Sequence, residues 1–174
     1  HQSTFQAGNL FAVGLTTVFD RFTKGYRPEE HRSELMVALC SSNGFDANQL
    51  KQIADQTIST AGTHQGDALD SWLKELSLQD GAHYSRLMGV GLLALLEASQ
   101  GEIDADAAEG LRKRACDLAP ALGLPPERVE KDLSVFASSS ERMQQAVELM
   151  EETQAAERRK KERRLAEAAA RSEA

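Results

Sequence analysis

The most apolar stretch of this 174-residue chain runs from Leu87 to Leu96 and reads LMGVGLLALL. From Ala82 to Ala98 the predicted helix carries apolar residues on nearly all of its sides, which is typical of a helix buried among others. A run of ten residues is far shorter than the roughly twenty needed to cross a bilayer. We therefore expect this stretch to form the central helix of an all-α fold, not a membrane span.

A weak repeat of this stretch lies near the start of the chain. Residues 10–15 read LFAVGL and residues 87–92 read LMGVGL, an offset of 77 that also aligns Asp20 with Glu97. A glycine inside a helix costs about 1 kcal/mol relative to alanine, so a packing reason is expected for both glycines. Our hypothesis is that Gly14 and Gly91 let two helices approach closely. Chance similarity between two buried helices is the alternative.

Helical periodicity continues through most of the remaining sequence, and no segment shows the period-two alternation of a strand. The predicted compact bundle has further helices at residues 11–22, 28–44, 46–62, 69–76, 104–122 and 129–136. The first should end near Lys24-Gly25 with a left-handed glycine, and Asp46 should cap the third. Asp104 or Asp106 should cap the helix that follows the central one. The helix after Pro28 is expected to point four residues inward, namely Leu35, Met36, Leu39 and Cys40.

The C-terminal segment differs from this bundle in composition. Ser138 and Glu141 predict a capping box, after which nothing breaks a helix for some 33 residues, or about 50 Å. We therefore expect a bundle domain over residues 1–140 and a long, projecting helix over 141–174, packed to about residue 150 and solvated beyond. Residues 151–174 hold seven basic and six acidic groups, a net charge of +1. Because the whole chain has a net charge of −7, residues 1–150 have a net charge of −8.

One basic patch stands out in this predicted helix, and we take it as the candidate partner-binding site. Its six residues are Arg158, Arg159, Lys160, Lys161, Arg163 and Arg164. An acidic protein surface or anionic lipid headgroups would suit such a patch. Nucleic acid is not expected as a partner, because the patch has no aromatic residue for base stacking. An ordinary solvated helix face is the alternative, and the heptad pattern is weak evidence for a coiled coil.

The sequence predicts no catalytic, cofactor or metal site. The four histidines have no partner at the spacing of a metal site or catalytic triad, and adjacent helical positions such as His83, Tyr84 and Ser85 do not face one another. Cys40 and Cys116 fall in apolar helical patterns, where a cysteine acts as a small hydrophobic residue. We therefore expect a protein that is not an enzyme and that has no cofactor.

Four segments of the chain resemble one known family. Residues 10–30 read LFAVGLTTVFDRFTKGYRPEE, which is similar to the signature of the thylakoid formation protein family. Three later segments follow in the family's order: ALCSSNGFDANQLKQIA from Ala38, HYSRLMGVGLLALLEA from His83, and ELMEETQAAERRKKERRLAE from Glu148. The chain departs from the family at Ala7-Gly8, where a Tyr-Asp pair is more usual. Relatives are also expected to carry a helical region before residue 1.

The resemblance implies a non-enzymatic, all-helical accessory protein that assists photosystem II biogenesis and repair. It implies a peripheral place on the thylakoid membrane, on the cytoplasmic or stromal side, and association with the FtsH protease, with photosystem II components reached indirectly. The exposed C-terminal helix is the expected contact element. Docking of its basic residues on anionic thylakoid lipids is the alternative function. The signature residues are expected to be structural: Phe11, Leu15, Phe19 and Phe22 in the core, and Tyr26 as a packing anchor at a turn.

Overall fold

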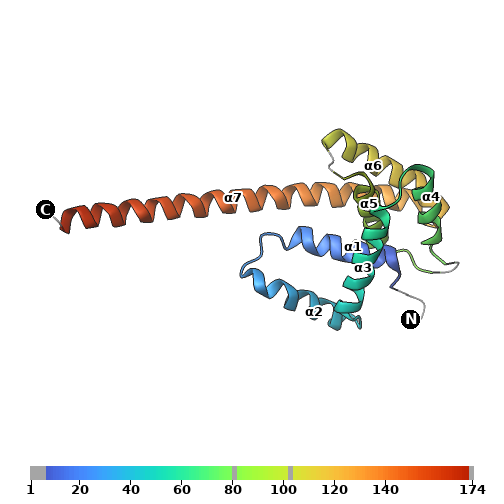
Figure 1. Cartoon of the computed structure of the whole chain (residues 1–174), viewed down its shortest axis with the longest axis horizontal. Coiled ribbons are helices and arrows are strands. Elements are labelled where there is room, and N and C mark those ends of the chain that lie inside the picture. Colours follow the sequence, from blue (N-terminus) through green and yellow to red (C-terminus); the bar gives the residue numbers. More distant parts are fainter. Residues whose placement is uncertain (1–6, 80–81, 102–103, 173–174) are drawn as a thin grey trace. The chain divides into compact units, whose positions relative to one another are not determined.

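A computed structural model describes residues 7–79, 82–101 and 104–172 of the chain. This part contains seven α-helices, two short 3-10 helices and no strand, so the all-α fold class is confirmed (Figure 1). In chain order the elements are α1 (Asn9–Phe22), η1 (Glu29–His31), α2 (Arg32–Ser42), α3 (Ala47–Gly62), α4 (Gly66–Glu75), α5 (Arg86–Gln100), α6 (Ala105–Leu118), η2 (Ala119–Leu122) and α7 (Pro126–Ser172).

The chain separates into two units, His1–Ser138 and Ser139–Ala174. The first unit contains α1 to α6 and the start of α7. The second unit consists of the rest of α7, which at 1.5 Å per residue makes the whole 47-residue helix about 70 Å long. From residue 151 to residue 168 the side chains of α7 are exposed, except for half-buried Ala155.

The predicted central helix lies at the core of the first unit. Helix α5 packs against α1, α3 and α6, and its side chains from Met88 to Leu96 are buried on all sides. Leu92, Leu95 and Leu96 have no exposed surface at all. They belong to one cluster of buried residues that draws on every helix of the unit, including Leu10, Leu50, Leu69, Leu111 and Leu133. An uninterrupted apolar run is thus stable here because each side of the helix faces another element.

The two glycines of the repeat mark the crossing of α1 and α5. A Cβ atom built on Gly14 would lie 1.7 Å from the carbonyl oxygen of Leu87, and one on Gly91 would lie 2.0 Å from the carbonyl oxygen of Leu10. These contacts are reciprocal under the same offset of 77 residues. The hypothesis of close approach is confirmed, and the repeat reflects two helices whose backbones touch at equivalent positions.

Several helix ends follow the sequence prediction. Asp46 Oδ1 accepts a hydrogen bond from the Gln49 amide at 3.0 Å, which caps α3. Asp104, the first of the two candidates, caps α6 by accepting from the Ala107 amide at 2.8 Å. Gly123 has φ +70° and ends η2, a conformation that few residues other than glycine adopt.

The predicted start of the last helix is wrong. Helix α7 begins at Pro126, and the apolar residues expected in a separate short helix belong to it. Ser138 does not cap a helix, because its hydroxyl donates to the Val135 carbonyl at 3.2 Å within α7. Proline suits the first helical position, since it has no amide hydrogen to leave unpaired there. The Pro125-Pro126 pair therefore starts this helix as well as separating it from η2.

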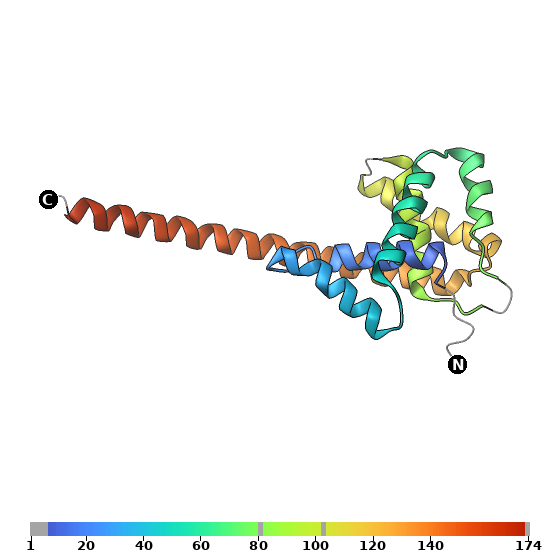
Figure 2. The ribbon, with the colours of Figure 1, turned by 60° about the horizontal axis from the view of Figure 1, so that its bottom comes forward.

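Three expectations near α1, α2 and α5 also need correction. Helix α1 ends at Phe22 without a left-handed glycine, because the amide and hydroxyl of Thr23 both donate to the Phe19 carbonyl, at 2.9 and 2.7 Å. Of the four residues expected to point inward from α2, Cys40 is buried and Leu35 and Met36 are half-buried, whereas Leu39 is 43% exposed. Figures 1 and 2 show α2 as the second arm of a hairpin with α1, and its packing partner is α3. Helix α5 starts at Arg86, later than predicted, because Ser85 caps it.

Candidate functional site

The six predicted partner-binding residues lie on α7 between positions 158 and 164. They are Arg158, Arg159, Lys160, Lys161, Arg163 and Arg164, and we call them the basic cluster. All six side chains are exposed. Within the described ranges, no hydrogen bond or ion pair joins any of the six to another side chain. The structure thus leaves the positive charge of the cluster available to a partner.

The basic cluster surrounds the helix instead of forming one stripe. Seven consecutive positions complete almost two turns at 3.6 residues per turn, so positive charge points to every side of α7. Only Glu162 interrupts the run. An acidic surface can therefore approach this part of the helix from any direction. Contacts of this kind accelerate association and weaken as the salt concentration rises.

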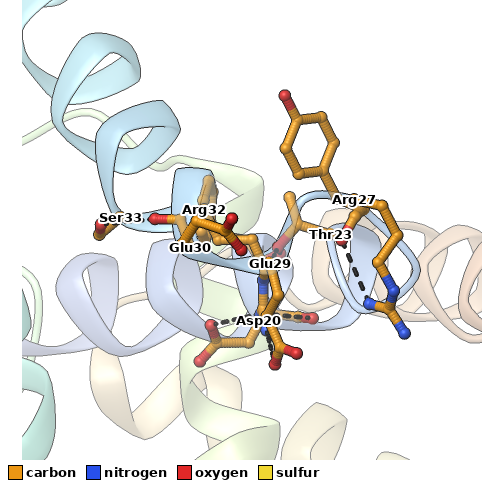
Figure 3. Close-up of polar contacts among 9 residues, drawn as sticks. Asp20, Thr23, Arg27, Glu29, Glu30, Arg32 and Ser33 are labelled. Atoms are coloured by element: carbon orange, nitrogen blue, oxygen red, sulfur yellow. Dashed lines mark hydrogen bonds and ion pairs between the residues drawn. The ribbon is translucent and has the colours of Figure 1, made fainter.

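A second group of polar residues joins α1 to α2 (Figure 3). The Nε atom of Arg32 donates to Thr23 Oγ1 at 3.1 Å, and its Nη2 atom donates to Asp20 Oδ1 at 3.3 Å. Glu29 Oε1 lies 4.0 Å from Arg32 Nη1. These bonds fix the turn between the two helices, which is a structural role. Tyr26 in the same turn is 39% exposed, so the packing anchor expected there is largely open to solvent.

An apolar groove lies beside α2. Its volume is about 670 Å³, and it is lined by Phe11, Leu15, Leu39, Cys40, Asn43, Gly44, Phe45 and Leu87. Among these lining residues, only Asn43 has an amide side chain. Its Nδ2 atom donates a hydrogen bond to the Leu39 carbonyl at 2.8 Å. Val37, on the same helix as Leu39, is 47% exposed. The lining offers mainly apolar contact, and among the lining residues only the buried Cys40 thiol is titratable.

The residues of the His83-Tyr84-Ser85 segment serve separate structural purposes. The Tyr84 hydroxyl donates to Asp132 Oδ2 at 3.0 Å, and Arg128 Cζ lies 5.0 Å from the centre of the Tyr84 ring. His83 is exposed, and Ser85 Oγ accepts from the Leu87 amide. Burial and then the bond to Asp132 raise the pKa of Tyr84 well above its usual range. Tyr84 therefore stays protonated at neutral pH and links α7 to the start of α5.

This link predicts a specific loss of stability at alkaline pH. In the unfolded chain Tyr84 ionises near pH 10, whereas the folded chain keeps the proton, so the free energy of unfolding falls as pH rises above about 10. We expect Tyr84→Phe to lower stability by about 1 kcal/mol at pH 7, because one hydrogen bond is lost, and to make the fall above pH 10 shallower. Urea unfolding between pH 7 and pH 11 measures both effects. The exposed Tyr26→Phe change is the control, and equal pH slopes for Tyr84→Phe and the unsubstituted chain would contradict the assignment.

Neither cysteine has the properties of a reactive or metal-binding thiol. Both are free, Cys40 being buried and Cys116 half-buried. Burial is the main cause that raises the pKa of each thiol, so both stay protonated at neutral pH. Among the residues that the structure describes, no group of three or more potential ligands lies close enough together to hold a metal ion.

The ion pairs between distant helices were not predicted from the sequence. Arg21 Nη2 lies 2.8 Å from Glu97 Oε2, and Arg114 Nη2 lies 2.6 Å from Asp70 Oδ1. The alignment of Asp20 with Glu97 in the repeat was one available signal. Both carboxylates accept from an arginine of another helix, Glu97 of α5 from Arg21 of α1 and Asp20 of α1 from Arg32 of α2.

Comparison with known proteins gives a consistent result. A sequence model of a family described as thylakoid formation protein matches residues 1–165. Protein Thf1 of Parasynechococcus marenigrum strain WH8102 is 69% identical over 169 residues, covering 97% of this chain and 78% of that protein. Protein Thf1 of Synechococcus sp. strain CC9902 is 57% identical over 173 residues, covering 99% and 80%.

A solved structure of Psb29 has a similar fold. Its TM-score with this chain is 0.68 at 32% sequence identity, over 91% of this chain and 79% of that one.

Among the helices that the structure describes, none combines the length and the apolar character that a membrane span requires.

Proposed function

Because the chain belongs to the thylakoid formation protein family, we propose that it is a non-enzymatic accessory factor for photosystem II biogenesis and repair. In this proposal it acts by contact with the FtsH protease complex of the thylakoid, and photosystem II components are reached indirectly. The observation that carries the contact is the basic cluster, six exposed cations with no partner among the described side chains.

The polar groups of the first unit support a non-catalytic role. Tyr84 and Asp132 bond to each other, and Arg32 bonds to Thr23 and Asp20, so these side chains already serve to hold helices together. A catalytic site needs groups that converge on a space where a substrate can bind. The groove of about 670 Å³ is such a space, but its lining is mainly apolar: the Asn43 amide already donates to the Leu39 carbonyl, and burial keeps the Cys40 thiol protonated.

Co-purification from thylakoids tests the proposal with the full chain. One variant replaces all six residues of the basic cluster with glutamine, which removes charge and preserves helix propensity. A matched control replaces Glu141, Glu151, Glu157, Glu162 and Glu167 with glutamine. We expect the unsubstituted chain and the control to recover FtsH subunits, and the basic-cluster variant to recover about tenfold less.

Two outcomes would count against this proposal. If the basic-cluster variant recovers as much FtsH as the unsubstituted chain, the cluster is not the contact. If the unsubstituted chain recovers no FtsH, the protease is not a stable partner.

Docking on anionic thylakoid lipids, on the cytoplasmic or stromal side, is the second candidate function. The same six cations favour it, since each Lys or Arg near an anionic surface contributes about 1 kcal/mol. The apolar residues of this part of α7 are few, with Leu165 the only large one beyond Met150. Flotation with anionic vesicles at low and moderate salt tests this function. Salt-sensitive flotation that the glutamine variant loses would support it, and its absence would exclude it.

A further inference from the structure

The distal part of α7 consists of two adjacent segments of opposite charge. Residues 144–157 contain four acidic residues and no basic one, net −4. Residues 158–171 contain seven basic and two acidic residues, net +5. The two segments have equal length and belong to one uninterrupted helix. A single net charge of +1 for residues 151–174 conceals this division.

One face of the helix carries both charges in a symmetric order. At about 100° per residue, six residues fall within an arc of about 100°. We call them the pairing face: Glu148, Glu152, Ala155, Ala156, Arg159 and Arg163. Glu148 lies as far before the midpoint of Ala155 and Ala156 as Arg163 lies after it. The same relation holds for Glu152 and Arg159.

We propose that the pairing face binds the same face of a second copy of this chain, with the two helices antiparallel. A two-fold axis between Ala155 and Ala156 would place Glu148 against the partner's Arg163 and Glu152 against the partner's Arg159. Symmetry repeats each pair, which gives four ion pairs. The small alanine side chains at the centre let the helices approach closely.

The charge order selects the antiparallel arrangement. A parallel pair in register would place Glu148 and Glu152 against the same residues of the partner, and like charges would repel. With the axis between Ala155 and Ala156, an antiparallel pair sets residues 144–153 of each acidic segment against residues 158–167 of the other copy's basic segment. Arrangements that bring like charges together are disfavoured in this way in coiled coils as well.

The pairing face is open in the structure. Its four charged residues are exposed, and Ala155 is half-buried. Glu148 Oε1 accepts one hydrogen bond from Gln144 Nε2 at 3.0 Å, which leaves its second oxygen for a cation. Half-buried Met143 lies on the opposite side of the helix, about 170° from the centre of the pairing face.

This inference does not depend on the proposed contact with the protease. Pairing uses Arg159 and Arg163 of the basic cluster, so a partner that binds the whole cluster would compete with self-association. The test uses the purified chain alone, without FtsH or membranes. Its result therefore leaves the outcome of the co-purification experiment open.

Sedimentation velocity of the purified chain tests the pairing. We expect dimer at low ionic strength, with monomer favoured in about 1 M salt, where the Debye length is about 3 Å. R159E/R163E and E148K/E152K should each raise the dissociation constant by at least about tenfold, because each brings like charges together. An equimolar mixture of the two variants should restore a mixed dimer, since every pair is then of opposite sign.

R158E/K161E is the matched control. It changes the net charge as much as R159E/R163E does and lies in the same turns, but on other sides of the helix. We expect it to dimerise like the unsubstituted chain, and circular dichroism verifies that all variants keep their helices. A monomer at every concentration and salt, an equal effect of the control, or a mixture that stays monomeric would each overturn the inference. A monomeric result would leave this face to a different protein partner.

Discussion

Gly14→Ala should destabilise the protein by about 3 kcal/mol or more, although alanine is the better helix former. The new Cβ atom would lie 1.7 Å from the carbonyl oxygen and 2.6 Å from the carbonyl carbon of Leu87. Both atoms belong to the backbone of α5, so no side chain can rotate away, and α1 must move off α5 as a whole. Overpacking in a core costs about 1–3 kcal/mol and more where the backbone has to shift. Urea unfolding at neutral pH measures the loss.

Gly110→Ala is the control for this prediction. Gly110 is also a helical glycine, in α6, but a Cβ atom there would have no neighbour within 4 Å. We expect this change to stabilise the protein by up to about 1 kcal/mol, as helix propensity predicts. The two glycine-to-alanine changes should therefore differ in sign. A neutral or stabilising Gly14→Ala would show that α1 and α5 do not cross as described.

The reciprocal contact at Gly91 sharpens the test. Gly91→Ala should also be strongly destabilising, because its Cβ atom would lie 2.0 Å from the Leu10 carbonyl oxygen. The double variant should lose less stability than the sum of the single losses, since the first alanine already separates the helices. Strict additivity would mean that the two sites do not share one crossing.

Sequence predicted the core helices α5 and α3 well because their apolar residues follow a plain helical pattern, on all sides in α5 and along one stripe in α3. The apolar run in α5 and the stripe of α3 follow from period and composition, and the structure buries Leu50, Ala54, Thr57 and Ala61 of α3. The glycine hypothesis succeeded for a related reason. A glycine that weakens a helix is retained where two backbones touch, and the repeat gave two such positions at once.

Sequence reasoning failed where a local sequence pattern was present but other parts of the chain determined the structure. Ser138 and Glu141 satisfy the pattern of a capping box, but α7 already runs through them from Pro126. Helix α2 is half apolar and was expected to bury one face, yet it has one buried residue, because it packs on α3 at the edge of the unit. The start of α7 and the exposure of α2 are therefore both decided by residues outside the segment in which the pattern was found.

The candidate site was only partly readable from the sequence. The basic cluster is a plain run of charge, and its exposure follows from its composition. The pairing face is different, because it appears only when the register of one continuous helix from Pro126 is known. With α7 in place, residues 11 or 15 positions apart share a face, so Glu148 can be related to Arg159 and Arg163.

Leu92→Ala should lower the free energy of unfolding by about 3 kcal/mol. Leu92 lies in the apolar run of α5 and has no exposed surface, so its truncation removes buried methyl groups and leaves a cavity. Leucine-to-alanine changes in cores cost about 2–5 kcal/mol. For a chain of this size, a loss of about 3 kcal/mol lowers the melting temperature by roughly 6–12 °C. Thermal unfolding followed by circular dichroism measures this shift.

Leu165→Ala makes the same chemical change on α7, where the side chain is 61% exposed. Because little surface is buried there, we expect its effect to stay within about 0.5 kcal/mol. The contrast between the two leucines separates burial from helix propensity, which is the same in both changes. If Leu92→Ala costs no more than Leu165→Ala, α5 is not the centre of the fold, and the apolar run from Leu87 to Leu96 must be buried in some other way.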